Sequence, residues 1–355
     1  MIDTIKLLLI SAGSLVGQNI IQAIGPRRSL FHLEATNSEP AEPSLADFDA
    51  VRIVPPTSVD TTGLDRLLNA RLDQGSCRLV IPCRDEEVLW LARHRETHPG
   101  HGDRLLVGSA ATAEIFLDKL LSWDFSRDNG LPFLPSVDLQ DTSKLDRFAR
   151  ENPFPLIVKP RKGFASRGVW ILTHPDQLEA HRHRSDVILQ PYCGDTHSAA
   201  SFLSDVQHRG LPLFHSFEET KHSIQTFITP SGELAGTFVT LHRMKRGVSR
   251  EVVPSACQQA HDLGQRVGRV FASAGWRGPL NIQCHREGLD DYRIYEYNGR
   301  FTGATAARAL LGFDELALAL ASFAGIHLPP LPNRHGAAVK QPFTRGTLPP
   351  LSPAP

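Results

Sequence analysis

The first 112 residues alternate short apolar runs with helical stretches, and this alternation limits the possible folds more than any other feature of the chain. A strand that is followed by a helix and then by another strand favours parallel pairing within one sheet. We therefore expect a parallel-sheet, Rossmann-like domain of the α/β class over residues 1–112. The expected strands lie at 5–10, 30–35, 51–54, 78–82 and 104–108, and the expected helices lie at 61–74 and 85–95.

The pattern changes in the second part of the chain. Residues 113–150 are expected to be helical with a break at 129–132. Beyond them, alternating segments separated by glycine and proline turns indicate α+β structure with mainly antiparallel strands. The expected strands lie at 156–159, 169–172, 187–190, 198–206, 211–220, 224–229, 234–241, 278–285 and 291–297, and the expected helices lie at 256–274, 304–311 and 313–325. We divide this part into subdomains at 113–193 and 194–327, followed by a flexible, proline-rich tail at 328–355.

Composition excludes several classes of protein. Lysine plus arginine and aspartate plus glutamate both number 38, so the chain has no net charge with which to bind a nucleic-acid backbone. The five cysteines are scattered without a C-x-x-C pair, which argues against a zinc site and favours a reducing compartment. The apolar run from Leu7 to Ile10 is far too short to cross a bilayer. We therefore expect a cytoplasmic protein without nucleic-acid or membrane partners.

A lysine at the end of an apolar strand begins the first group of residues that carries chemistry. The segment reads Ile157-Val158-Lys159-Pro160-Arg161-Lys162-Gly163-Phe164-Ala165-Ser166-Arg167-Gly168-Val169. Glycines allow backbone N–H groups to approach phosphate closely, and lysine supplies a point charge for the phosphate oxygens. The segment therefore predicts a phosphate-binding loop at 161–168, and a solvated basic hairpin is the alternative.

Polar residues on two consecutive strands form the second group. Glu296 and Asn298 are two apart on one expected strand, so their side chains share a face. Gln283 lies on the preceding strand and faces them if the two strands pair. Carboxylate and amide oxygens suit Mg²⁺ that also takes phosphate oxygens and water. Arg300, at the end of the strand, would point toward the same phosphates, and the alternative is a strand with a wet polar face.

The glycine-containing turn after the first strand permits a competing interpretation. Gly13 and Gly17 follow a strand, and Glu34 ends the next one, which partly matches a dinucleotide site. The third glycine of that motif is missing. We therefore favour a substrate-binding or structural role for this turn over NAD binding.

In combination and in this order, the loop V-K-P-R-x-G-x-x-S-R-G and the strand pair N-I-Q … E-x-N-x-R resemble the phosphate loop and metal strand of the ATP-grasp superfamily. The chain is similar, over roughly residues 5–325, to enzymes like the large subunit of carbamoyl-phosphate synthetase. The resemblance implies a pre-ATP-grasp first domain, followed by an ATP-grasp fold of two α+β subdomains. It also implies ATP and Mg²⁺ as cofactors, with Mn²⁺ as an alternative metal.

The resemblance implies a role for individual residues around the nucleotide. Glu296, Asn298 and Gln283 would hold the metal. The residues that would contact the phosphates are Lys119, Lys159, Arg161, Gly163, Ser166 and Gly168. The residues that would contact adenine and ribose are the hinge strand Gln190, Pro191, Tyr192 and Cys193, and then Asp195. Arg243 and Lys245 match a basic strand that faces an acyl phosphate.

The chain departs from the family pattern at three places. Pro191 stands where glutamate is usual and removes one backbone donor. Between residues 195 and 201, Asp195 is the single acidic residue for the ribose. The metal strand continues as Asn298-Gly299-Arg300 where N-P-R is usual. These departures concern nucleotide affinity and purine choice, and they leave the phosphate and metal groups unchanged.

The resemblance implies an ATP-dependent carboxylate-amine ligase. The γ-phosphoryl group of ATP would convert a carboxylate into an acyl phosphate, and an amine or another nucleophile would then attack it. Arg300, Arg243 and Lys245 would stabilise the transferred group. The expected partners are small-molecule carboxylates and amines, and a homodimer is left open. Two alternatives remain: an NAD-dependent oxidoreductase that uses the first domain, and a non-catalytic ATP-binding sensor, which the altered hinge would fit.

Overall fold

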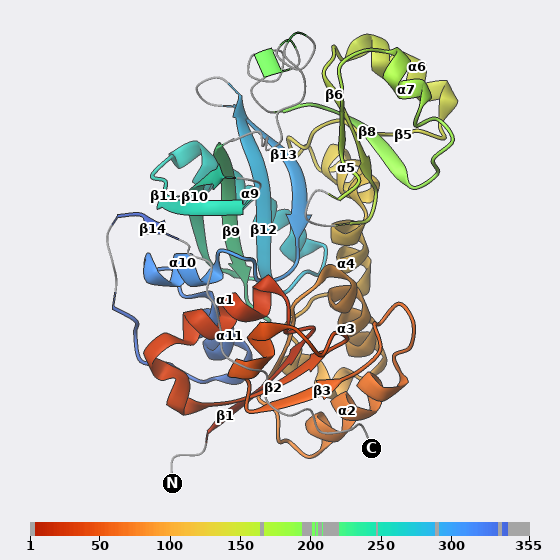
Figure 1. Cartoon of the computed structure of the whole chain (residues 1–355). Helices are drawn as coiled ribbons and strands as arrows, with labels where there is room; N and C mark the ends of the chain where they lie inside the picture. The colour runs from red at the N-terminus through yellow and green to blue at the C-terminus, as the bar shows by residue number, and fades with distance from the viewer. Residues whose placement is uncertain are drawn as a thin grey trace.

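Three β-sheets organise the chain. The computed structural model describes residues 4–163, 167–193, 220–245, 248–287, 291–332 and 336–339, together with residues 201, 202, 204 and 208. In Figure 1 a parallel sheet lies at the bottom, a small antiparallel sheet at the upper right and a six-stranded antiparallel sheet at the upper left and centre. The mixed α/β and α+β class predicted from the sequence is confirmed.

The first sheet is parallel, with strand order β3-β2-β1-β4. Its strands are β1 Ile5–Ile10, β2 Phe31–Asn37, β3 Ala50–Ile53 and β4 Leu79–Pro82. The α-helices of this domain are α1 Leu15–Ile24, α2 Thr62–Asp73 and α3 Asp85–Thr97. Its 3-10 helices are η1 Gly25–Leu30, η2 Pro43–Asp47 and η3 Pro99–Arg104. β4 is buried along its whole length, as its continuous apolar sequence predicts for a sheet covered on both faces. The strand expected at 104–108 is reduced to an isolated bridge between Val80 and Leu105.

The small sheet, which we call the lid, has the order β5-β8-β6-β7, and residues of β6 and β8 line the cavity described below. Its strands are β5 Val137–Asp138, β6 Leu156–Pro160, β7 Trp170–Leu172 and β8 Val187–Pro191. Helices α4 Ala110–Leu117 and α5 Lys119–Asp128 lead into it, and α6 Thr142–Glu151 and α7 Asp176–Glu179 belong to it. Asp118 separates α4 from α5, because its carboxylate accepts hydrogen bonds from the backbone N–H groups of Leu120 and Leu121 and so caps α5.

The six-stranded sheet has the order β13-β12-β9-β10-β11-β14 and is antiparallel. Its strands are β9 Thr220–Ile228, β10 Leu234–Lys245, β11 Val248–Pro254, β12 Gly278–Glu287, β13 Asp291–Asn298 and β14 Ala338–Val339. Helix α9 Gln258–Ser273 packs on β9 and β10 with its apolar residues, so one face of the sheet is covered. The other face is polar and turns toward the lid.

Two C-terminal helices return to the first domain. Helices α10 Thr305–Leu310 and α11 Glu315–Ala324 pack against α1. Leu316 and Leu320 of α11 join the hydrophobic core that surrounds Leu7 and Leu9 of β1. The first domain and the C-terminal part of the chain therefore share a core.

Several segments differ from the sequence-based expectation. The expected tail at 328–355 is not free throughout, because β14 pairs with β11 and the Pro329 carbonyl oxygen accepts a hydrogen bond from Arg27 Nη1 at 3.2 Å. Residues 340–355 lie outside the described residues. The described residues within 198–206 are helical rather than extended, and residues 211–219 are not among those described. β11 was not predicted.

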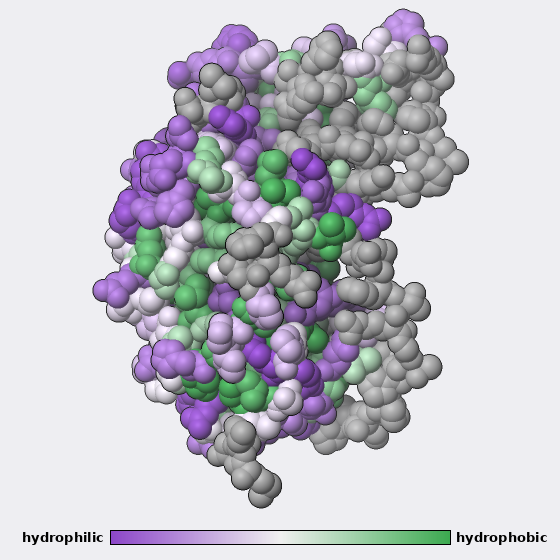
Figure 2. All heavy atoms as spheres, turned by 90° about the vertical axis from the view of Figure 1, so that its left-hand side faces the viewer, coloured by the Kyte–Doolittle hydropathy of each residue, from purple (hydrophilic) through white to green (hydrophobic). Residues whose placement is uncertain are grey.

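The surface is mixed in character. Figure 2 shows the side of the molecule that carries β14 and α10, where apolar residues are interspersed with polar ones. None of the helices in the described part of the chain has the length and apolar character needed to cross a bilayer.

Gly108→Ala should destabilise the seam between the first domain and β12. A Cβ atom on Gly108 would lie 2.5 Å from both the Gly275 carbonyl oxygen and the Trp276 Cα, so the backbone would have to move. We expect the unfolding free energy to fall by about 1–3 kcal/mol, the usual effect of overpacking. Thermal or urea denaturation of the purified protein measures this change.

Gly63→Ala is the matched control, because no atom lies within 4 Å of a Cβ at this helical position. It should leave stability unchanged or slightly higher. Equal stability of Gly108→Ala and the wild type would show that the two parts do not pack as closely as described.

Candidate active site

A cavity of about 580 Å³ lies between the lid and the polar face of the six-stranded sheet. β6 and β8 line one side, and β9, β10, β12 and β13 line the other. The cavity extends to the loop before α10 and to Leu15 at the start of α1. The predicted site residues that line it are Lys119, Lys159, Gly163, Gln190, Tyr192, Cys193, Gln283 and Glu296. Residues from distant parts of the sequence therefore meet around one space.

The polar face of the large sheet follows from strand alternation. Every second residue of β12 from Asn281 to His285 lines the cavity, with Gln283 between them. Gln283 lies opposite Ser223 of β9 on one side and opposite Glu296 of β13 on the other. The pairing of Gln283 with Glu296 that the metal hypothesis requires is therefore present.

Two lysines and one carboxylate meet on one wall of the cavity. Lys119 Nζ lies 3.6 Å from Glu296 Oε1 and donates to the Gly163 carbonyl oxygen at 3.1 Å. Lys159 Nζ donates to the Tyr295 carbonyl oxygen at 3.2 Å. Burial, and secondarily the charge of Lys119, lower the pKa of Lys159 to about 8, although Glu296 opposes the shift. Two ammonium groups against one carboxylate give this wall an excess of positive charge that suits phosphate.

The loop after β6 has the backbone conformation that its glycines allow. Gly163 has φ of 150° and lines the cavity, and Gly168 has φ of 72°. Residues with side chains rarely adopt positive φ, so both positions favour glycine. Ser166, Asp195 and the side chain of Lys245 lie outside the described residues.

Arg161 anchors the start of the loop instead of lining the cavity. Its guanidinium lies 2.7 Å from Asp118 Oδ2 and 3.0 Å from Asp138 Oδ2. Two carboxylates from the preceding segment take up its donors, so a phosphate contact of Arg161 stays a prediction that would require these ion pairs to open. Arg161 thus fastens the lid to the cap of α5.

The oxygen donors of the cavity suit a metal ion that keeps water and phosphate oxygens among its ligands. Gln283 and Glu296 face each other in the cavity, whereas Asn298 is buried and its Oδ1 accepts from Arg300 Nη2 at 3.1 Å. Across the residues that the structure describes, no three histidine, cysteine or acidic side chains converge on one ion. One carboxylate with an amide oxygen fits Mg²⁺ that retains water and phosphate ligands, and it does not form an all-protein cage.

Arg300 connects the metal strand to the first domain. Its Nη2 atom lies 2.7 Å from Asp85 Oδ2, and its Nη1 donates to the Phe301 carbonyl oxygen at 3.2 Å. Arg300 does not line the cavity. The predicted contact with a transferred phosphoryl group would therefore require the ion pair with Asp85 to open.

Strand alternation turns Arg243 away from the cavity. On β10, His242 and Met244 line the cavity, and Arg243 between them lies 2.7 Å from Glu251 of β11. The contact of Arg243 with an acyl phosphate stays a prediction, and the pleat places Arg243 on the side of the strand opposite the cavity lining.

The hinge strand brings three of its four predicted residues to the cavity. Gln190 lines it and is buried, with Nε2 donating to Ser136 Oγ at 2.9 Å. Tyr192 and Cys193 follow and also line it, whereas Pro191 ends β8 and does not. The hinge therefore forms the edge of the cavity next to the lid.

Sequence reasoning missed several residues of the polar face. Lys221 and Ser223 of β9, Asn281 of β12, His242 of β10 and Thr302 before α10 all line the cavity. Asn281 was detectable, because it lies two residues before Gln283 and must share its face. Lys221 and Ser223 required knowledge that β9 is the neighbour of β12.

Lys159→Met should raise stability at neutral pH. The pKa of Lys159 falls from 10.5 to about 8 on folding, so below pH 8 both states keep the proton and the destabilisation is fully present. Between pH 8 and 10.5 the folded state releases the proton that the unfolded state keeps, so wild-type stability rises. We expect Lys159→Met to gain about 3 kcal/mol at pH 7 and to lose this advantage above pH 8. Thermal melts of both proteins from pH 7 to 10 measure it.

Lys144→Met serves as the control, because Lys144 is an exposed lysine on α6. The difference in stability between Lys144→Met and the wild type should stay constant from pH 7 to 10. An advantage of Lys159→Met that stays constant from pH 7 to 10 would show that the folded protein does not disfavour the charged amine.

No family model and no curated protein matches the chain. Solved structures do match. The biotin carboxylase domain of 2-oxoglutarate carboxylase from Hydrogenobacter thermophilus, solved with MgADP, ADP and bicarbonate, has a TM-score of 0.65 and 17% identity, covering 92% of this chain and 71% of that chain. N5-carboxyaminoimidazole ribonucleotide synthetase from Thermotoga maritima has a TM-score of 0.64 and 17% identity, covering 92% and 78%.

Biotin carboxylase from Campylobacter jejuni gives a similar result. Its TM-score is 0.61 at 14% identity, and the match covers 92% of this chain and 72% of that chain. These neighbours are ATP-grasp ligases, and each match covers 92% of this chain. The chain therefore has the ATP-grasp fold, as the loop and strand motifs predicted.

Proposed function

We propose that this chain is an ATP-dependent ligase that activates a carboxylate as an acyl phosphate for attack by an amine. The wall formed by Lys119, Lys159 and Glu296 carries the proposal. Beside a glycine-rich loop, the two ammonium groups suit the phosphates of a nucleoside triphosphate, and the carboxylate suits its divalent cation. The ATP-grasp fold supports the same function.

The chemistry explains why the site needs these charges. A carboxylate does not react with an amine directly, because oxide is a poor leaving group. In the proposed step a bond forms between the carboxylate oxygen and the γ-phosphorus, and the bond to the bridging oxygen of ADP breaks. Negative charge spreads over the transferring oxygens, where Lys119 and Lys159 stabilise it. The lid limits the access of water, which would hydrolyse an acyl phosphate.

Gln283 and Glu296 would hold the metal ion. Mg²⁺, or Mn²⁺ in its place, neutralises part of the phosphate charge when it is bound. Lys119 Nζ lies 3.6 Å from Glu296 Oε1 on the same wall. Asn298 Oδ1 accepts a hydrogen bond from Arg300, which leaves one lone pair for a metal ion.

The substrates belong to small-molecule classes. One neighbour was solved with bicarbonate beside MgADP, so bicarbonate joins the small carboxylates among our candidates. The amine is proposed from the reaction class alone. The five cysteines, all of which the structure describes, are outside disulfides, which suits a reducing compartment such as the cytoplasm.

The NAD-dependent alternative has less support. The Gly13 turn is covered by Asn37, whose Oδ1 accepts from Gly13 N at 3.1 Å. Glu34, the candidate ribose ligand, is already bound by Arg52 at 2.9 Å and by Arg71 at 2.7 Å. These contacts fill the positions that a dinucleotide would need.

Mg-ATP should bind and stabilise the protein. At a hundred times its Kd, a ligand raises the unfolding free energy by about 2.7 kcal/mol. Glu296→Gln keeps the shape but removes the charge, so its stabilisation by ATP should become insensitive to Mg²⁺. Thermal melts with ATP, with and without Mg²⁺, measure both effects.

Glu287→Gln is the matched control, because Glu287 lies on the same hairpin, is exposed and pairs with Arg293 at 3.0 Å. It should respond to Mg-ATP as the wild type does. The absence of any shift at millimolar Mg-ATP in the wild type would rule out the proposed function.

Carboxylate-dependent release of ADP should separate a ligase from a nucleotide sensor. We expect ADP release to depend on one member of a panel of bicarbonate, amino acids and dicarboxylates, each offered with ammonia and primary amines. Lys159→Met should reduce kcat by roughly two to three orders of magnitude, because it removes one donor to the developing charge. A protein that binds Mg-ATP and releases ADP with none of these compounds would favour the sensor.

A further inference from the structure

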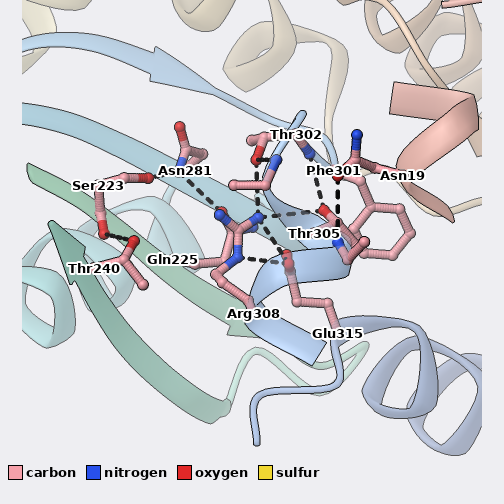
Figure 3. A network of polar contacts seen from close by, with 12 residues as sticks. Asn19, Ser223, Gln225, Thr240, Asn281, Phe301, Thr302, Thr305, Arg308 and Glu315 are labelled. Carbon is pink, nitrogen blue, oxygen red and sulfur yellow. Dashed lines mark hydrogen bonds and ion pairs between the residues drawn. The ribbon is translucent and has the colours of Figure 1, made fainter. Parts of the chain in front are cut away.

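A fully buried ion pair lies next to Thr302, which lines the cavity. Arg308 of α10 and Glu315 of α11 have no exposed side-chain surface, and Arg308 Nη2 lies 2.7 Å from Glu315 Oε2. The same nitrogen donates to the hydroxyl oxygens of Thr302 at 2.9 Å and of Thr305 at 3.2 Å. Figure 3 shows the guanidinium joined to these three side chains.

Stability alone does not account for this pair. The desolvation of two charges offsets most of their attraction, and an apolar pair of similar volume often serves packing equally well. The contacts that Arg308 makes outside the pair therefore indicate its role. They lead to Thr302, which lines the cavity.

The hydrogen bonds of Thr302 fix the direction of its proton. Its Oγ1 accepts one bond from Arg308 Nη2 at 2.9 Å and one from the Ala304 backbone N–H at 3.2 Å. A hydroxyl has two lone pairs and one proton, so both acceptor positions are filled. Among the described residues the structure shows no acceptor for that proton. The Thr302 O–H is left to donate into the cavity, and the adjacent guanidinium charge polarises it.

The charge of the cavity determines what kind of acceptor this donor meets. In the described lining, the acidic residue is Glu296 alone. The cationic residues of the lining are Lys119, Lys159, Arg167 and Lys221. An excess of cations draws in an anionic ligand, whose oxygens are strong acceptors for a polarised hydroxyl.

The first turn of α10, which follows the loop of Thr302, is also held from the first domain. The Ala306 backbone N–H donates to Asn19 Oδ1 at 3.4 Å, and Asn19 Nδ2 donates to the Leu15 carbonyl oxygen at 2.9 Å. Leu15 lines the cavity as well. Thr302 is therefore fixed between two packed elements.

We propose that the Arg308–Glu315 pair is a positioning pair, which orients the Thr302 hydroxyl to donate a hydrogen bond to an anionic oxygen of the substrate. The inference rests on the proposed function and names the class of group bound at this wall: the oxygen of a carboxylate, or of the phosphate attached to it. Thr302 contacts the ligand, and Arg308 and Glu315 act through Thr302.

Anion titrations of the protein saturated with Mg-ADP test this proposal. Inorganic phosphate and acetate are the two probes, and the melting temperature is followed in separate series. We expect at least one anion to stabilise the wild type further. Thr302→Val should weaken the binding of that anion roughly ten- to a hundredfold, which is the effect of losing a hydrogen bond to a charged group. The melting-temperature shift caused by Mg-ADP should stay unchanged. The responding probe tells whether phosphate or carboxylate oxygen is bound.

Three further variants separate positioning from folding. Thr302→Ser keeps the hydroxyl and should restore anion affinity. The double variant Arg308→Met with Glu315→Leu leaves no unpaired buried charge. It should weaken anion binding as much as Thr302→Val does, and Mg-ADP should still raise its melting temperature. Thr229→Val, in an exposed turn, is the control and should match the wild type.

Wild-type anion affinity in Thr302→Val, or no anion-dependent shift in the wild type, would overturn the proposal. Wild-type affinity in the double variant alone would overturn the role of the pair. An absent Mg-ADP shift would instead count against the proposed function. The same titrations without nucleotide would then still compare Thr302→Val with the wild type, and equal affinities would overturn the role of Thr302.

Discussion

Lys159 holds an ammonium group in a place where burial makes the charge unfavourable, and the remainder of the site depends on how that charge is balanced. The Tyr295 carbonyl oxygen accepts from Nζ at 3.2 Å, and Glu296 supports the charged form. Lys119 opposes it, because a second ammonium group lies nearby. The local excess of positive charge is relieved when Lys159 releases its proton or when an anion enters. The buried charge of Lys159 therefore lowers the stability of the protein, and it suits the anion of the proposed function.

Several arginines, among them two that the sequence suggested as ligand-binding residues, join parts of the molecule. Arg161 fastens the lid to α5, and Arg300 fastens the metal strand to α3. Arg308 joins α10 to α11 and holds Thr302. Planar guanidinium groups suit this use, since several donors can bind carboxylates and hydroxyls at once. Lysines provide most of the cationic groups within the cavity.

The sequence could predict the features that depend on local order. Lys159 ends an apolar strand before glycines, and Glu296 shares a strand face with Asn298, so both were recognised as site residues. It could not predict whether Arg161, Arg243 or Arg300 faces a ligand, because each meets a carboxylate that is fixed by tertiary packing. The sheets and their class followed from strand patterns. The pairing of β14 with β11 did not, because two residues carry too little pattern.

The hydrophobic cores cross the boundary that the sequence pattern suggests at residue 112. Leu316 and Phe323 of α11 pack in the same core as Leu7 and Leu9 of β1. Ile282, next to the proposed metal ligand Gln283, belongs to the core that contains Leu8. Exchange of the first domain as a separate unit during evolution would therefore disrupt two hydrophobic cores. A replacement of the first domain would have to preserve its contacts with α10 and α11.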